Sequence, residues 1–154
     1  MGRLDKESEG LLLLADDARL AQRLMDPGSL PKVYRVVVEG FPRDEDLAEM
    51  RAGGSVLDGR VLKAAPVTRL GKAPRGGTRL EVTLREGVNR QIRRQLAAAG
   101  FRVRRLRREA VGPVALGDLP PGEGRELSPA ELGSLLDALG GAGPCEDRGS
   151  GNER

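Results

Sequence analysis

The sequence predicts an α+β domain in which helices flank a mixed, mainly antiparallel β-sheet. Two observations lead to this prediction. Segments with the alternation or the β-branched composition of strands are interspersed with helical segments along most of the chain. Several of these strands are connected by short turns, which join antiparallel neighbours in a sheet. A chain of 154 residues can enclose a core without disulfide bonds or metals, so a single domain is expected.

The first forty residues are predicted to form a strand, a helix and a second strand. Four consecutive leucines, 11–14, are flanked by glycine and charged residues, a pattern typical of a strand buried on both faces. The aspartates at 16–17 can cap a helix that runs to Met25, after which a Pro-Gly pair ends it. Residues 32–40 combine β-branched side chains, a tyrosine and alternating charge, which indicates a strand.

The middle of the chain is predicted to contain a surface helix, a hairpin and two further strands. The helix is expected over 43–52, closed by two glycines. Residues 56–62 place Asp-Gly between two short apolar pieces, which is a strong hairpin signal. Residues 66–70 are expected to be extended, and a flexible basic loop, 71–77, separates them from a strand over 78–84 with a two-residue alternation.

A helix and an arginine-rich strand follow. The apolar stripe of Ile92 and Leu96 predicts a helix over 89–99, which a glycine ends. Residues 101–108 alternate apolar side chains with arginine, so they are expected to form a strand with one basic face. The proline- and glycine-rich stretch 112–124 is expected to be a loop.

A capping box marks the last predicted helix. Ser128 is followed by proline at the first helical position and by Glu131 three residues on, the arrangement in which the two side chains satisfy each other's backbone amides. Residues 140–154 lack any apolar anchor and are predicted to be disordered. The domain is therefore expected to cover 1–139.

The composition excludes several kinds of active site. The chain has no histidine and a single cysteine, Cys145, so neither a Ser-His-Asp nor a Cys-His nucleophile system can be built within it. A zinc site of cysteine and histidine ligands is excluded for the same reason, and we expect neither metal nor cofactor. No apolar run is long enough for a membrane span and no signal-peptide pattern is present, which favours a cytoplasmic protein without a membrane partner.

Positive charge is concentrated in one segment. The formal net charge is only +3, yet residues 85–108 contain nine arginines and one acid, Glu86. Such clustering is typical of a surface that binds a polyanion. An arginine-rich surface from a GC-rich genome or a heat-loving source is the alternative explanation of the charge alone.

Three side chains are candidates for chemistry. Asp5 lies at the mouth of the predicted leucine strand, and Tyr34 is the only tyrosine. At 100° per residue, Arg93 lies on the flank of the buried stripe that Ile92 defines, whereas Arg90 and Arg94 point toward solvent. Arg93 is thus placed to pair with a partly buried acid, and a neighbouring cation keeps a carboxylate ionised.

These residues belong to a set of five motifs. The motifs are Gly2-Arg3-Leu4-Asp5, Glu9-Gly10-Leu11-Leu12, Lys32-x-Tyr34, Glu86-Gly87-x-Asn89-Arg90-Gln91-Ile92-Arg93-Arg94 and Gly100-x-x-Val103-x-x-Leu106-x-Arg108. This set resembles the RsuA-type pseudouridine synthases, which modify uridines in ribosomal RNA, and the similarity extends from residue 2 to about 132. The sequence is most similar to the large-subunit members without an S4-type RNA-binding domain.

The resemblance implies the family's catalytic core and a role for each motif. Asp5 would be the catalytic nucleophile, Tyr34 would pack on the target base and help to move a proton, and Arg93 would hold Asp5 in place. Leu106 would line the uracil pocket. The positions implied to bind the substrate are Arg3, Leu4, Lys32, Asn89, Arg90, Gln91, Arg94 and Leu106.

The implied reaction rearranges one nucleotide, needs no redox change and therefore no cofactor. The implied partner is ribosomal RNA, and neither DNA binding nor an oligomer is expected. Family members normally carry a strand and loop before the Gly-Arg-Leu-Asp motif, so we expect the native chain to begin upstream of Met1. An intact mass of 16.5 kDa for the protein from its own cell would contradict this expectation.

Two other functions are compatible with the residues. The first is a non-catalytic ribosomal-RNA-binding or ribosome-assembly module that uses the same basic face. The second is a metal-dependent nuclease, for which the acids would be Asp16, Asp17, Asp44 and Asp46, although these acids are also typical of helix caps and solvated faces.

Overall fold

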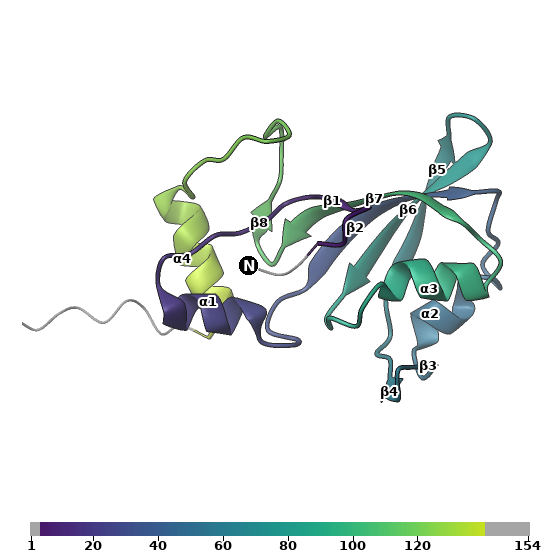
Figure 1. The fold of residues 1–154 in the computed structure, drawn as a ribbon, viewed down its shortest axis with the longest axis horizontal. Coiled ribbons are helices and arrows are strands. Elements are labelled where there is room, and N and C mark those ends of the chain that lie inside the picture. Colours follow the sequence, from purple (N-terminus) through teal and green to yellow (C-terminus); the bar gives the residue numbers. More distant parts are fainter. Residues whose placement is uncertain (1–3, 141–154) are drawn as a thin grey trace, which may run out of the picture.

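The computed structural model describes residues 4–140, and its main feature is a six-stranded sheet (Figure 1). The strands lie in the order β1-β7-β2-β6-β5, and β8 pairs with β7. β1 runs parallel to β7, whereas the other paired strands of this sheet are antiparallel. This mixed, mainly antiparallel sheet confirms the predicted fold class. Its strands are β1 (Glu9–Gly10), β2 (Lys32–Glu39), β5 (Val67–Ala73), β6 (Gly77–Leu84), β7 (Val103–Val111) and β8 (Val114–Ala115).

The helices are gathered at the two ends of the sheet (Figure 1). α2 and α3 lie beneath one end, together with a small separate hairpin of β3 and β4, and α1 and α4 lie side by side at the other end. Within residues 4–140, no helix has the length and apolar character needed to cross a membrane. The remaining elements are α1 (Ala18–Met25), α2 (Ala48–Ala52), β3 (Val56–Leu57), β4 (Arg60–Val61), α3 (Gln91–Ala98) and α4 (Pro129–Ala138).

Each pair of helices covers its own apolar cluster. Under α2 and α3, Met50 and Leu96 pack with side chains from β2 and β6, among them Val38 and Leu80. At the other end, α1 and α4 enclose a second cluster with the segment after β1 and with β8. Burying a side chain such as Leu96 contributes roughly 1.5–3 kcal/mol relative to leaving it exposed. The space between the two clusters is where the candidate site lies.

Several local signals in the sequence are confirmed. The Asp17 carboxylate accepts hydrogen bonds from the backbone amides of Arg19 and Leu20, at 2.7 and 3.1 Å, and so caps α1. Asp58 and Gly59 both have positive φ, 52° and 75°, which is the conformation that an Asp-Gly hairpin turn requires. β2 and β6 also lie where the alternation placed them.

The predicted capping box at α4 is present and leads to a testable pH dependence. The Glu131 carboxylate accepts hydrogen bonds from the guanidinium of Arg125 and from the backbone amide of Ser128, and these contacts lower the pKa of Glu131 from 4.5 to about 2. A lowered pKa means that the contacts stabilise the folded state above about pH 4.5 and that this stability is lost as the pH falls toward 2. We therefore expect Glu131→Gln to lower the melting temperature at neutral pH.

That difference in melting temperature between wild type and Glu131→Gln should be constant above about pH 5 and should shrink progressively below it. Thermal unfolding followed by circular dichroism between pH 2 and pH 7 measures it. A difference that persists unchanged to pH 2 would show that the charge of Glu131 is not what stabilises the start of α4.

The predicted leucine strand is wrong. β1 consists of Glu9–Gly10 only, and residues 11–14 are not part of a strand, although the Leu11 amide still donates a hydrogen bond to the Arg108 carbonyl. Leu11 and Leu13 are buried, but Leu12 and Leu14 are 50% and 85% exposed. The segment lies at the edge of the sheet, where the second cluster covers only one of its sides. Four leucines in a row therefore do not form a strand buried on both faces.

Other boundaries also differ from the prediction, among them that of the strand expected over 101–108, which is β7 (Val103–Val111). The helix expected over 43–52 begins only at Ala48. The basic segment 71–77 is largely strand, with a tight turn in which Arg75 and Gly76 have φ of 60° and 71°. The loop expected over 112–124 contains the short strand β8. Apart from Gly140, the tail predicted to be disordered lies outside the described residues.

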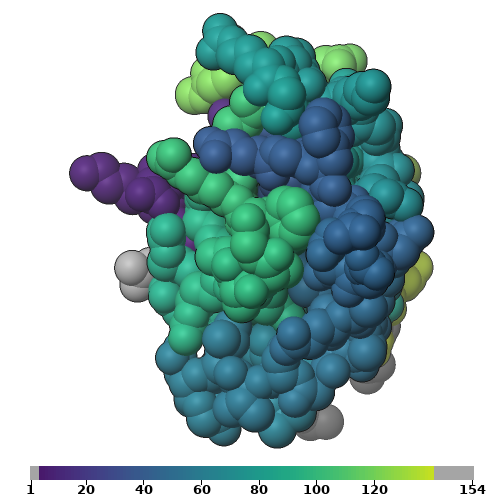
Figure 2. Space-filling view, turned by 90° about the vertical axis from the view of Figure 1, so that its right-hand side faces the viewer, coloured from purple at the N-terminus to yellow at the C-terminus, as the bar shows by residue number. Residues whose placement is uncertain are grey.

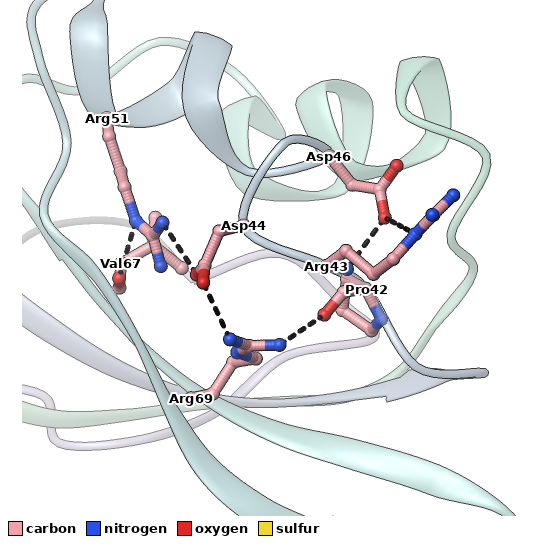
Figure 3. Close-up of polar contacts among 7 residues, drawn as sticks. All are labelled: Pro42, Arg43, Asp44, Asp46, Arg51, Val67 and Arg69. Atoms are coloured by element: carbon pink, nitrogen blue, oxygen red, sulfur yellow. Dashed lines mark hydrogen bonds and ion pairs between the residues drawn. The ribbon is translucent and has the colours of Figure 1, made fainter.

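The late start of α2 has a visible cause. The side chain of Asp44 bonds Arg51 and Arg69, at 3.0 and 2.9 Å, and Asp46 accepts a hydrogen bond from the Arg43 amide at 2.7 Å (Figure 3). These acids fold the segment into a turn that ties α2 to β5 rather than into a first helical turn. Asp44 thus links three elements.

Candidate active site

One pocket collects most of the residues that the sequence analysis predicted for the site. It has a volume of about 400 Å³ and lies between the segment before β1, the start of β2, the end of α1 and the start of α3. The first described residues of the chain therefore meet α3 on this side of the sheet. The predicted site residues that line it are Leu4, Asp5, Lys32, Tyr34, Asn89, Arg90, Gln91 and Leu106.

Asp5 lies in a turn that β1 fixes to the sheet. The carbonyl of Asp5 accepts a hydrogen bond from the Ser8 amide at 2.9 Å. Gly10 then lets β1 approach β7 very closely, because it has φ of +113° and a Cβ at this position would lie 2.3 Å from the Arg108 carbonyl oxygen. Only glycine fits such a position. This contact anchors the turn, and with it the Asp5 carboxylate, at the pocket.

β2 contributes Lys32 and Tyr34, which share a face because side chains alternate along a strand. Tyr34 is paired in register with Arg108 of β7, and the buried Leu106 lies two residues before that arginine. Partial burial lowers the pKa of Lys32, and the neighbouring charge of Arg108 lowers it further. Two cations held in one pocket favour a ligand that carries negative charge or electron-rich oxygens.

Arg108 was not predicted as a site residue, although it is only 1% exposed and lines the pocket. Its Nε donates a hydrogen bond to the Leu11 carbonyl at 2.8 Å, and its own carbonyl accepts one from the Leu11 amide. Arg108 therefore contacts both the carbonyl and the amide of Leu11, and so holds the chain in place just after the Asp5 turn. The signal for it was its spacing from Leu106, because residues two apart in a strand face the same way.

The start of α3 closes another side of the pocket. The helix begins at Gln91 rather than Asn89, because Arg90 has φ of 51°, a left-handed conformation outside the helix. Arg90 extends to the Glu7 carboxylate, 2.8 Å away, and this contact lowers the pKa of Glu7. Gln91 is buried and donates to Glu86 at 2.7 Å. The left-handed conformation of Arg90 thus places both Asn89 and Arg90 at the pocket instead of in the helix.

Two buried oxygens of the pocket wall lack a protein partner. Ser8 and Gln91 both line the pocket, and within residues 4–140 neither the hydroxyl of Ser8 nor the side-chain oxygen of Gln91 has a hydrogen-bond partner. Buried polar atoms without partners are costly and are rare in folded proteins. Their presence here is what a wall built to bind a polar molecule would show.

Arg93 does not line this pocket, which differs from the expectation that it would pair with Asp5. It donates from Nη2 to the Glu7 carbonyl at 2.8 Å and from Nη1 to the Val103 carbonyl at 3.4 Å. Its acceptors are backbone carbonyls rather than the predicted acid, because the turn presents its main chain to α3. Arg93 consequently connects the Asp5 turn to β7 without touching the carboxylate.

A further predicted residue, Arg94, does not line the pocket. Arg94 does not extend freely into solvent but forms a two-pronged ion pair with Asp58 of the β3–β4 turn, with distances of 2.6 and 2.9 Å. Arg90 is likewise paired rather than free. Arg3 lies outside the described residues.

Three of the four acids considered for a metal-dependent nuclease have other functions in the fold. Asp17 caps α1, and Asp44 and Asp46 bond arginines and a backbone amide around the start of α2 (Figure 3). The fourth, Asp16, is exposed. Across residues 4–140, no group of three or more histidine, cysteine, aspartate or glutamate side chains is arranged to hold a metal ion.

Comparisons with known proteins agree on one family. Residues 1–98 match the family described as RNA pseudouridylate synthase. The chain is 41% identical to an uncharacterized RNA pseudouridine synthase of Aquifex aeolicus, with 91% of this chain and 56% of that protein covered. It is 40% identical to ribosomal large subunit pseudouridine synthase E of Vibrio parahaemolyticus, with coverages of 82% and 58%. The protein of the same name from Xanthomonas axonopodis is 43% identical, with 78% and 70% covered.

Solved structures give the same result. A crystal structure of a pseudouridylate synthase superimposes with a TM-score of 0.78 at 30% identity, covering 87% of this chain and 57% of that one. A chain from the archaeal box H/ACA sRNP Nop10-Cbf5 complex, at 24% identity and a TM-score of 0.53, shares the fold. The chain spans little more than half the length of the first two relatives. By its matched residues and its fold, this chain belongs to the RNA pseudouridylate synthase family.

Proposed function

We propose that the protein isomerises a uridine of large-subunit ribosomal RNA to pseudouridine, with Asp5 as the nucleophile and without a cofactor. The observation that supports this proposal best is that Asp5 and Tyr34 line one pocket of about 400 Å³. That volume lies within the range of small-molecule sites and suits a single nucleotide. The names of the Vibrio and Xanthomonas relatives favour large-subunit ribosomal RNA as the substrate.

In the proposed reaction, a carboxylate oxygen of Asp5 attacks C1′ of the target ribose as the N1–C1′ bond breaks. The bonding electron pair leaves with the uracil, which turns within the pocket. C5 of the uracil then bonds to C1′ and displaces the Asp5 carboxylate, and the proton on C5 is lost while N1 gains one. Atoms and electrons balance within the nucleotide, so neither an oxidant nor a metal is required. Nucleophilic catalysis of this kind divides one difficult exchange into two easier steps.

The other pocket residues would bind and orient the base. Tyr34 offers a ring for the uracil to stack on and a phenol that can carry the proton between C5 and N1. Leu106 supplies an apolar wall, and the unpartnered oxygens of Ser8 and Gln91 are suited to the base's imide N–H. Lys32 and the buried Arg108 would attract the electron-rich oxygens of the nucleotide.

The target base must leave its stack before it can enter the pocket. Unstacking costs a few kcal/mol, which contacts to the RNA backbone offset. The arginines of α3 and β7 supply such contacts, and Arg3, Asn89, Arg90 and Arg94 are proposed to bind the RNA there. For Arg94, RNA would compete with Asp58.

Mapping of pseudouridines in ribosomal RNA tests the proposal. A strain that lacks the gene should show a single large-subunit site as uridine, and the wild-type gene supplied on a plasmid should restore the modification. A modification pattern that does not change on deletion would contradict the proposal and favour the non-catalytic RNA-binding module. Assembly profiles of the ribosomal subunits in the same strains would identify such a module, because its loss would alter assembly without altering any pseudouridine.

A further inference from the structure

A second cavity, of about 640 Å³, lies beside the pocket on the side of α3 and β7. Its wall includes Arg90, Arg93, Arg102 and Arg104, together with Glu7 and Phe101, and we call it the arginine groove. Arg90 lines both cavities, so the groove continues from the pocket. In the space-filling view, the green start of β7 and the purple N-terminal residues lie on the same face (Figure 2).

The groove carries a strong excess of positive charge. Four guanidinium groups face one carboxylate, Glu7, within its lining. Outside the lining, Glu39 lies 3.7 Å from Arg102, with both side chains exposed, and Asp5 acts on Arg90 through its charge. Exposed pairs of this kind contribute little. A concave surface with this charge is complementary to a chain of phosphates.

Two of these arginines are held in place by the protein backbone. Arg104 donates to the carbonyls of Pro74 and Arg75 at 2.9 and 3.1 Å, and it lies over Gly77, where a Cβ would come within 2.2 Å of its Nη2 atom. Arg93 is held by the carbonyls of Glu7 and Val103, as described above. Carbonyls orient a guanidinium without neutralising its charge, and each guanidinium has five donors. These cations are therefore oriented in advance and still charged.

The ion pair between Glu7 and Arg90 lies at the boundary between the two cavities. Nη2 of Arg90 is 2.8 Å from the Glu7 carboxylate, and both side chains are exposed enough for an incoming anion to reach them. A carboxylate and a phosphodiester each spread one negative charge over two oxygens that arginine can bind. Glu7 thus has the position and charge of a phosphate that belongs at this boundary.

We propose that the arginine groove binds the phosphate backbone of the RNA strand next to the target uridine, and that one phosphate displaces Glu7 from Arg90. This inference rests on the proposed function, because it names where the same RNA is held. Phe101, on the groove wall, offers a ring to a base or ribose of the flanking strand. In the absence of RNA, Glu7 keeps Arg90 oriented, and in the complex the phosphate takes over that contact.

The test measures the affinity of the full chain for a fluorescent hairpin of large-subunit ribosomal RNA over a series of salt concentrations. Arg102→Ala and Arg104→Ala should each weaken binding by about 3- to 10-fold and reduce the slope of log K against log salt by about 1. Glu7→Gln should bind RNA about 2- to 5-fold more tightly, because the phosphate no longer has to break an ion pair.

Arg19→Ala provides the matched control. Arg19 is 80% exposed and 3.9 Å from its acid partner, close to the 82% and 3.7 Å of Arg102, but it lies on α1 at the other end of the sheet. The affinity of the Arg19→Ala variant for RNA, and its salt slope, should equal those of wild type. Groove variants that behave like Arg19→Ala would overturn the inference, as would a Glu7→Gln variant that binds RNA no more tightly. Polyglutamate that competes as well as RNA of equal charge would also overturn it.

The binding readout requires no turnover, so the two proposals can fail separately. Normal pseudouridine formation with unchanged salt slopes would contradict the groove alone. Loss of affinity in the groove variants, combined with a wild type that forms no pseudouridine, would contradict the isomerase alone. Circular dichroism of each variant confirms that it is folded.

Discussion

Asp5→Asn is expected to lower kcat for pseudouridine formation by about 10⁴-fold or more, the scale on which enzymes lose turnover when the nucleophile is removed. The amide carries no negative charge and cannot form the bond to C1′. Within residues 4–140 the Asp5 carboxylate makes no hydrogen bond or ion pair, and the turn is held by the Asp5 carbonyl, so the fold should be retained. Single-turnover measurements with saturating RNA give the rate, and titration of labelled RNA gives the affinity, which should change by less than about 2-fold.

Asp16→Asn is the control for this variant. Asp16 is an exposed aspartate shortly before α1, and α1 is capped by its neighbour Asp17 instead. The substitution removes the same charge from the same region of the chain and should leave kcat at the wild-type value. Equal activity of the Asp5→Asn variant and wild type would exclude Asp5 as the nucleophile.

Arg93→Ala is expected to lower kcat, measured with saturating RNA, by about 10²-fold, in addition to the weaker RNA binding expected of an arginine that lines the groove. Arg93 joins the Glu7 carbonyl, two residues after Asp5, to the Val103 carbonyl at the start of β7. Without it the Asp5 turn has one contact fewer to the sheet, and a displacement of about 1 Å can cost on the order of 10²-fold in rate. Arg93 acts through the turn and is therefore a positioning residue. Arg93→Lys should recover little activity, because an ammonium does not reproduce the rigid fork of the guanidinium.

Arg51→Ala separates this positioning effect from a loss of stability. Arg51 also extends from a helix to a backbone carbonyl, that of Val67 at 2.9 Å, but it lies in the network around Asp44 (Figure 3). Its replacement should lower the melting temperature without changing kcat at a temperature where the variant is folded. If Arg93→Ala loses melting temperature and retains kcat in the same way, the positioning role is wrong.

Elements with strong local signals could be predicted from the sequence. Asp-Gly at 58–59 requires positive φ at both residues, and the Ser128–Glu131 box satisfies its own amides, so neither depends on distant parts of the chain. β2 and β6 were predictable for a similar reason, because their alternation records which face is buried. These features survive any change in the surroundings that keeps the core in place.

Features that depend on distant partners could not be predicted. The leucines at 11–14 are typical of a central strand, but the neighbouring strands decide whether a segment lies at the centre or at the edge of a sheet. The alternation of buried and exposed side chains also changes within β7, the arginine-rich strand, because its pairing with β2 shifts register between Val37 and Val38. That shift directs Leu106 and Arg108 inward and leaves Arg104 and Arg105 exposed. A fixed two-residue alternation cannot reveal it.

In the candidate site, some features could be predicted from the sequence and others could not. The family motifs brought Asp5, Tyr34 and Leu106 together in the prediction, and they line one pocket in the structure. Helix periodicity predicted an acid as the partner of Arg93, but it could not identify the backbone carbonyls that accept from it, because a sequence of side chains does not show where main-chain carbonyls lie. Arg108 is one of nine arginines in the same segment, and Arg104 has the same two-residue spacing from Leu106. That spacing therefore did not single out Arg108, which its burial does.

The release of tritium from RNA labelled at C5 of uridine tests the central claim most directly, because C5 must lose its hydrogen when it bonds to C1′. The full-length protein, incubated with labelled large-subunit ribosomal RNA, should release tritium from one uridine per molecule, and the Asp5→Asn variant should bind the RNA and release none. Tritium release by Asp5→Asn at the wild-type rate, or RNA binding by wild type without any release, would contradict the account.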